Sequence, residues 1–346
     1  MISKEVEMVG KFLSAVLLTL ALPAASFAGG FCCQVSTGDQ SGFSKAGDKS
    51  LGVDYNYSLM DRVLSGGEEV SISKLKADPR FKRMVSGKGG SLPISMDMQR
   101  INLAGSYAVT DKLVMNVAVP WVINDMTMTS LMAGSWGADM KMNQVRGLGD
   151  VTLTGSYRVY QDKTDHPTST VYLGGGLKLP TGTCSVNDNR KRVHAHMQPG
   201  TGSWDPILLA SWSKVLSSSF FLQTDAKYQM ATANGYGYSF GDTLNIGTDL
   251  KYNVASYMNS SLGLSYFHSG QSDDPDNAYN GKYSNRLTDY VGYTGEDSLW
   301  ISPGIQVMPF SGCSVNVKFQ YPIMCSVPDF EQVTTYRITA GITYSF

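Results

Sequence analysis

Hydrophobic and polar residues alternate along most of this 346-residue chain. The pattern is clearest over residues 336–346, where every second side chain is apolar or aromatic and the others are Arg, Thr, Gly or Ser. A period of two predicts a strand with one apolar and one polar face. Aromatic residues at both ends of the apolar face, Tyr336 against Tyr344 and Phe346, are typical of a strand that crosses a membrane within a β-barrel.

The same alternation recurs in twelve segments, which we predict to be strands: 51–59, 101–109, 113–121, 151–159, 171–179, 206–215, 220–228, 244–254, 262–266, 299–309, 314–324 and 335–346. The connections alternate in length. Short turns are expected at 110–112, 161–168, 216–219, 255–257 and 311–313, and longer loops at 65–94, 126–148, 183–204, 230–242, 269–298 and 325–334. Short turns at one end and long loops at the other are typical of outer-membrane proteins. We therefore predict an all-β fold, a closed transmembrane antiparallel up-and-down β-barrel of about 12 strands over residues 50–346. A soluble β-sandwich is the alternative.

The N-terminal region predicts export. Residues 12–22 are apolar, and small residues precede Ala28, as in a secretory signal peptide over 1–28. Met1 and Met8 both remain candidate start residues. Residues 29–49 show no alternation and form either a leader or a plug inside the barrel. We expect a bacterial outer-membrane protein in contact with lipid and lipopolysaccharide, whose terminal Phe346 is the kind of residue that the barrel assembly machinery reads.

Composition narrows the function further. A net charge of -1 argues against a nucleic-acid partner, which requires a concentrated basic surface. The four histidines, at 166, 194, 196 and 268, belong to no nucleophile or acid–base motif, so we do not expect an enzyme. His194-Ala-His196, in a predicted surface loop, has too few ligands for a metal site, and no cofactor motif is present.

The five cysteines leave two alternatives, a bridge or unpaired thiols. Cys313 and Cys325 flank one predicted strand about 30 Å long, too far apart for a disulfide. Cys184 and Cys325 share the loop side of the barrel and are the candidate pair. Cys32 and Cys33 lie on the opposite side with Cys313.

Polar and ionisable residues occupy the positions that face away from the apolar side of each strand. Eleven of them are ionisable and are predicted to line a pore: Asp54, Arg100, Asp150, Arg158, Lys178, Asp225, Lys227, Asp249, Lys251, Lys318 and Arg337. Seven are basic and four are acidic, which motivates a hypothesis of anion or carboxylate preference. The alternative is that neighbouring charges neutralise one another and brace the barrel.

The loop at 126–148 is rich in methionine, a flexible and polarisable side chain that suits adaptable apolar contacts. It either receives an apolar solute at the mouth or packs into the barrel as a constriction. The residues concerned are Met126, Met128, Met132, Trp136, Met140 and Met142.

Four short motifs stand near strand ends: Val119-Pro-Trp121, Gly147-Leu-Gly-Asp150, Leu177-Lys-Leu-Pro-Thr-Gly182 and Gly200-Thr-Gly-Ser-Trp-Asp-Pro206. In this order they resemble the outer-membrane family associated with the meta pathway of phenol degradation. That resemblance implies a channel for small, often aromatic or hydrophobic molecules, distantly similar to long-chain fatty-acid transporters. The motif residues themselves are interpreted as structural, because Gly and Pro at strand ends set tight bends.

The sequence thus predicts a passive outer-membrane channel for small solutes, with aromatic, hydrophobic or anionic compounds as candidates. The alternative function is a structural or partner-binding barrel that transports nothing.

Overall fold

Twelve long strands form the body of the protein in the computed structural model, which describes residues 45–79, 90–132, 135–164, 166–188, 191–275 and 291–346. The strands are β1 (Lys49–Met60), β4 (Gly90–Ala108), β5 (Leu113–Met132), β8 (Thr152–Gln161), β9 (Ser169–Lys178), β12 (Asp205–Val215), β13 (Phe220–Gln229), β14 (Thr243–Ala255), β15 (Met258–Ser269), β16 (Glu296–Phe310), β17 (Cys313–Ser326) and β19 (Tyr336–Ser345).

The strands close into a barrel. Each pairs in antiparallel fashion with its neighbours in the order β4-β1-β19-β17-β16-β15-β14-β13-β12-β9-β8-β5, and β5 pairs back onto β4. The first and last strands are joined over ten register pairs, from Ser50–Ser345 to Leu59–Tyr336. The predicted twelve-stranded, closed, up-and-down barrel is therefore confirmed.

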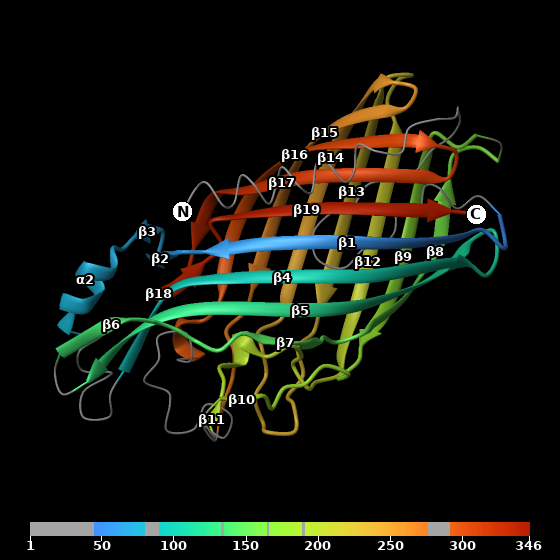
Figure 1. Cartoon of the computed structure of the whole chain (residues 1–346). Coiled ribbons are helices and arrows are strands. Elements are labelled where there is room, and N and C mark those ends of the chain that lie inside the picture. The colour runs from blue at the N-terminus through green and yellow to red at the C-terminus, as the bar shows by residue number, and fades with distance from the viewer. Residues whose placement is uncertain (1–44, 80–89, 133–134, 165, 189–190, 276–290) are drawn as a thin grey trace.

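The two ends of the barrel differ (Figure 1). At the terminal end, tight turns join the strands, and the backbone of Phe346 exchanges two 2.9 Å hydrogen bonds with that of Lys49. At the loop end lie the short elements β2 (Arg62–Ser65), β3 (Glu68–Glu69), α2 (Ile72–Ala77), β6 (Ser135–Lys141), β7 (Val145–Leu148), β10 (Asn187–Asp188), β11 (Lys191–Arg192), η2 (Ala195–Met197), η5 (Val291–Tyr293) and β18 (Phe330–Val333).

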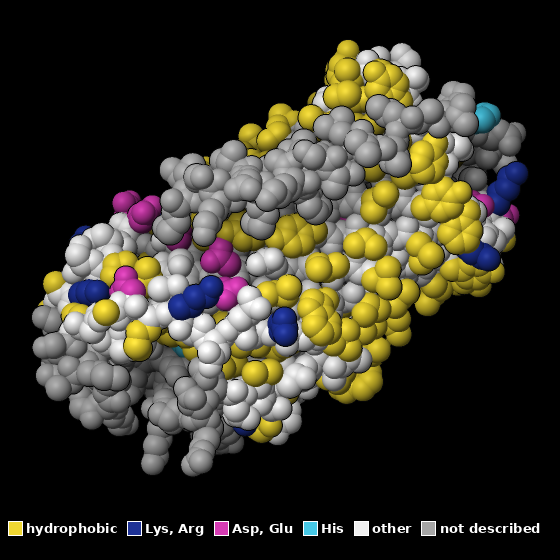
Figure 2. Space-filling view, viewed as in Figure 1, with side chains coloured by type: hydrophobic (Ala, Val, Ile, Leu, Met, Phe, Trp, Pro, Cys, Tyr) yellow, Lys and Arg dark blue, Asp and Glu magenta, His cyan; other side chains and the backbone are white. Residues whose placement is uncertain are grey.

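Apolar side chains cover the outside of the wall, whereas polar side chains are buried inside it. On β4, Leu103 is 53% exposed while the neighbouring Asn102 is only 7% exposed. Figure 2 shows the apolar side chains spread over the barrel wall, with charged side chains mainly toward the two ends. This distribution is the reverse of a water-soluble sandwich, whose apolar faces meet in a dry core. It matches a surface that faces hydrocarbon.

Replacing Leu103 with arginine should therefore destabilise the barrel in a bilayer. A charged side chain on the lipid face costs roughly 2–4 kcal/mol near the midplane. Urea unfolding of the protein in liposomes measures this loss. The matched control is Ser218→Arg, on an exposed turn at the terminal end, and an equal loss for both variants would contradict a lipid-facing wall.

The structure departs from the predicted element boundaries at the loop end. β4 and β5 run about one strand length beyond the predicted segments, and residues 126–148 are not a loop, since they include the end of β5, β6 and β7. The loops before β4 and before β19 contribute the small sheet β18-β2-β3. Together with α2, this sheet packs around Leu75 and Leu92, both fully buried. Among the described helices, none is long and apolar enough to cross a membrane.

The proposed Cys184–Cys325 bridge is wrong. No disulfide joins the described cysteines, Cys184, Cys313 and Cys325. Cys184 lies next to Gly202, whereas Cys325 packs against the core of Leu64, Val327 and Val333 on another part of the rim. Cys32, Cys33 and the whole signal-peptide segment lie outside the described residues.

The reactivity of the Cys325 thiol tests whether this side chain is buried at the rim as described. Burial, reinforced by the carboxylate of Glu296, raises the pKa of the Cys325 thiol to about 12. The thiolate is the nucleophile, so alkylation of Cys325 should be slow at pH 8 and rise roughly tenfold per pH unit toward pH 12. Glu296→Gln removes one of the two causes and should accelerate alkylation. Mass spectrometry of iodoacetamide-treated protein measures the rate, and a rate independent of pH would contradict the prediction.

Candidate functional site in the barrel lumen

Charged side chains gather inside the barrel at two levels. The predicted pore residues all lie at, or next to, inward positions of the strands, and all eleven are buried or half-buried. Asp54, Asp150, Lys178, Asp249, Lys251 and Lys318 are each at most 9% exposed.

The lower level, toward the terminal end, contains an ion pair between β14 and β17, which are separated by two other strands. Lys318 Nζ on β17 lies 2.7 Å from Asp249 Oδ1 on β14. The intervening strands present Gly263 and Gly304 here. A Cβ at Gly263 would lie 2.5 Å from Asp249 Oδ1, so only glycine leaves room for the carboxylate. Lys251 donates to Gln223 Oε1 at 3.2 Å on the same level.

A small cavity of about 30 Å³ opens beside this ion pair. Its lining combines charged and amide side chains with glycine: Asp249, Lys251, Asn259, Gln306, Asn316 and Lys318 with Gly304. Such a volume holds about one water molecule.

The upper level brings together positive charges from opposite walls. Arg100 on β4 interacts electrostatically with Arg337 on β19 and with Asp150. Lys227 on β13 interacts with Arg100, Lys178 and Asp205. Between β4 and β13 lie four strands on one side of the barrel and six on the other. An interaction between Arg100 and Lys227 therefore passes across the lumen.

Asp150 is the centre of the upper level. Its Oδ2 accepts hydrogen bonds from Lys178 Nζ at 3.1 Å and from both the backbone N–H and the hydroxyl of Thr201 at 2.8 Å, while its Oδ1 accepts from the N–H of Gly182 at 2.9 Å. Lys178 Nζ also lies 2.7 Å from Asp205 Oδ2. The two carboxylates thereby tie the ends of the β9–β12 loop to the inner wall.

Glycines from three of the sequence motifs allow this convergence. A Cβ at Gly182 would meet the backbones of Gly200 and Gly149 at 2.7 and 2.8 Å, and a Cβ at Gly200 would lie 2.6 Å from Asp150 Oδ1. Gly149 in turn packs on Pro120 and on the carbonyl of Pro199. The motifs are structural, as predicted, but they meet at one place. Together they hold the loop in the lumen.

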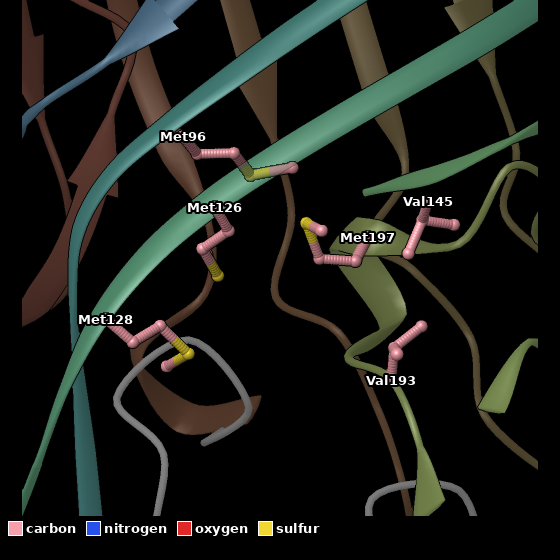
Figure 3. Packing of buried hydrophobic residues seen from close by; sticks show 6 residues of the cluster. All are labelled: Met96, Met126, Met128, Val145, Val193 and Met197. Carbon is pink, nitrogen blue, oxygen red and sulfur yellow. The ribbon is translucent and has the colours of Figure 1, made fainter. Parts of the chain in front are cut away.

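The β9–β12 loop contributes to a methionine-rich cluster at the loop end. Met197, in η2, is fully buried against Met96, Met126 and Met128, together with Val145 and Val193. Figure 3 shows Met96 and Met126 on neighbouring strands, with the Met197 side chain reaching toward them from the loop. Asn124 Nδ2 donates to the carbonyl oxygen of Met197 at 3.2 Å and fixes the helical turn.

The predicted mouth residues do not form one group. Met126 and Met128 belong to the cluster, and Met142 packs at its edge, but Met140 is 52% exposed. Trp136 lies elsewhere, donating to the carbonyl oxygen of Lys76 on α2 at 3.4 Å. The side chain of Met132 lies outside the described residues. The predicted surface loop at His194 is also wrong, since this side chain is only 2% exposed.

Comparison with known proteins identifies the family. The family of the MetA pathway of phenol degradation matches residues 85–308, more than half of the chain. The chain belongs to this family. No curated protein matches it.

Two solved structures are similar to this member of the phenol-degradation family. An outer membrane channel from Pseudomonas putida F1 is 16% identical, with a TM-score of 0.56, and the match covers 90% of this chain and all of that one. The toluene transporter TbuX from Ralstonia pickettii is 11% identical, with a TM-score of 0.40, over 87% of this chain and 89% of that one. At 16% identity, the likeness to the first of these structures concerns the fold.

Sequence reasoning did not single out Met96, Met98 or Met197, or the role of Asp205. For Met96 and Met98, the sequence did contain a signal of their inward position. Before Arg100, the apolar residues of β4 occupy the inward positions and the polar ones, Asp97 and Gln99, the outward positions. This phase is opposite to that of Ile101 and Leu103, and it marks the point where the strand leaves the apolar belt.

Proposed function

We propose that the protein is a bacterial outer-membrane channel that admits small solutes by passive diffusion, with aromatic and other hydrophobic compounds as its first candidates. The observation that carries the proposal is the combination of an apolar outer wall with a charged lumen whose loop end is lined by methionines. Methionine adapts its shape to apolar and aromatic groups and makes favourable sulfur–aromatic contacts. The loop end is the external mouth in this proposal, and the terminal end faces the periplasm.

Export and assembly belong to the same proposal. A signal peptide is cleaved near Ala28, and the terminal aromatic is presented to the assembly machinery. Phe346 is 58% exposed and stacks on Tyr344, with ring centroids 5.8 Å apart. Outer-membrane lipid and lipopolysaccharide surround the apolar wall.

The experiment is solute uptake into liposomes that contain the purified barrel. Toluene analogues, phenolic acids, sugars and amino acids are compared at equal concentration. Uptake of aromatic solutes above that of empty liposomes is expected, with little uptake of sugars larger than the constriction.

The buried methionine cluster at the loop end favours a second candidate, a structural or partner-binding barrel without transport. Met96, Met126 and Met197 pack together at the loop end, where β4 and β5 meet the β9–β12 loop. Absence of uptake for every solute, with the barrel folded, would favour this second function over the channel.

A further inference from the structure

Methionine is concentrated in one buried cluster at the loop end. Among the described residues, seven side chains of this cluster are methionine and three are valine, although the whole chain has only 17 methionines in 346 residues. The seven are Met60, Met96, Met98, Met126, Met128, Met142 and Met197. The other apolar core near this rim, around Leu75 and Leu92, is built from Val, Leu, Phe, Ile, Trp and Tyr in the part of the chain that the structure describes. Apolar packing at this end of the barrel therefore does not require methionine.

The register of the sheet aligns four of the methionines in one row. Met60 on β1 lies directly opposite Met96 on β4, and Met96 lies directly opposite Met126 on β5. The backbone N–H of Met142 donates to the carbonyl oxygen of Met126 at 2.8 Å, which extends the row to a fourth segment. Side chains directly opposite each other have Cβ atoms about 5 Å apart. Because methionine has three rotatable bonds, neighbouring sulfur atoms in such a row can converge on one point.

The β9–β12 loop adds a methionine from outside the row. The side chain of Met197 points toward Met96 and Met126 (Figure 3), and all three side chains are at most 2% exposed. The 3.2 Å hydrogen bond from Asn124 Nδ2 fixes the backbone of Met197. Three buried thioethers are thus supplied by three separate elements, β4, β5 and η2.

The ligands that this cluster offers are neutral and soft. Asp97 and Asp125, the only acids of β4 and β5, occupy outward positions, where Tyr57 donates to Asp97 and Lys141 lies 3.3 Å from Asp125. No group of three or more His, Cys, Asp or Glu side chains that could hold a metal ion occurs among the described residues. Thioethers select soft ions such as Cu(I), whereas Mg²⁺ and Ca²⁺ prefer oxygen ligands. Neutral ligands also favour a monovalent ion, because burying charge without a counter-charge is costly.

We propose that Met96, Met126 and Met197 form a binding site for a soft monovalent metal ion, Cu(I), at the loop end of the barrel. Each sulfur atom donates a lone pair to the ion, and the other four methionines surround the three ligands. The bound ion links the β9–β12 loop to β4 and β5 and stabilises the loop in its observed position. This site goes beyond the proposed channel function and does not depend on transport.

The test measures Cu(I) binding by the folded barrel in detergent, in competition with the Cu(I) chelator bathocuproine disulfonate and with ascorbate as the reductant. Thiols also bind Cu(I), so the five cysteines are replaced by serine, and the wild-type chain is measured beside this parent. The parent should retain one Cu(I) per chain.

Two variants of the parent, Met126→Leu and Met197→Leu, keep the side-chain volume and remove one sulfur each. Each should weaken Cu(I) binding about tenfold or more, since even groups that only orient a metal ligand contribute about 10–100-fold to affinity. Met140→Leu is the matched control, at a methionine that is 52% exposed, and should bind Cu(I) as the parent does. Cu(I) should also make the 191–199 segment of the parent several-fold more resistant to protease.

The outcomes decide between a metal site and simple packing. A folded parent that holds no Cu(I), or a Met126→Leu variant that binds Cu(I) as tightly as the parent, would overturn the site and leave the cluster as an apolar core. X-ray absorption should show sulfur neighbours around copper, and nitrogen neighbours would overturn the thioether site in favour of His194 or His196. If the cysteine-free chain does not fold, the wild-type and Met126→Leu barrels are compared directly, and equal numbers of bound Cu(I) ions would contradict the proposal.

Discussion

Replacing Asp150 with asparagine should open the proposed channel. The carboxylate accepts four hydrogen bonds, three of which come from the two ends of the β9–β12 loop, at Gly182 and Thr201. Hydrogen bonds to a charged group contribute about 1.5–3 kcal/mol each. Weakening these hydrogen bonds should release the loop and move Met197 out of the cluster. Every 1.4 kcal/mol lost changes the ratio of released to held loop about tenfold. We expect uptake of small neutral solutes such as glycine or benzamide to rise about tenfold.

The control for this experiment is Asp54→Asn. Asp54 is also a buried carboxylate on the inner wall, 2% exposed, but it lies near Gly341 and Asn316 toward the terminal end. Its replacement should leave the loop in place and uptake unchanged. The heat-modified mobility of both variants on a denaturing gel shows whether the barrel has folded. A folded Asp150→Asn barrel with wild-type uptake, and with the 191–199 segment resistant to added protease, would show that this carboxylate does not hold the loop in place.

The barrel itself could be predicted from sequence because its determinant is local. Each strand carries its own alternation, and lipid outside with water inside fixes which parity is apolar. The inward positions of Asp249 and Lys318 follow from that parity alone. Their pairing does not, because it depends on which side chains meet over the two intervening strands and on the glycines at 263 and 304 that leave space between them.

The methionine cluster at the loop end could not be predicted for two physical reasons. First, the apolar phase of β4 and β5 inverts where the strands leave the membrane, so that Met96 and Met126 point inward and were assigned to loops. Second, the position of Met197 is set by contacts distant in sequence, from Asp150 and Asn124. Gly149, Gly182 and Gly200 were visible as motif residues, but only the fold shows that they pack against one another.

Replacing Lys318 with methionine should strongly destabilise the barrel. Methionine preserves most of the side-chain volume but leaves the carboxylate of Asp249, whose side chain is 7% exposed, without its cation. Removing one partner of a buried ion pair typically costs about 3–5 kcal/mol, because the remaining charge is desolvated and unpaired. Urea or guanidinium unfolding of the barrel in lipid vesicles, followed by tryptophan fluorescence, measures the change.

The double variant Lys318→Met with Asp249→Leu distinguishes an unpaired charge from a packing defect. With both charges removed, the desolvation cost disappears, and the double variant should recover most of the stability that the single variant loses. Lys112→Met, on an exposed turn at the terminal end, should change stability by less than about 0.5 kcal/mol. Should the double variant be as unstable as Lys318→Met alone, the loss would come from the shape of the lysine side chain and not from the ion pair. In that case the lower lumen would be braced by packing around Gly304 and Ser261, and its charges would be available to solutes.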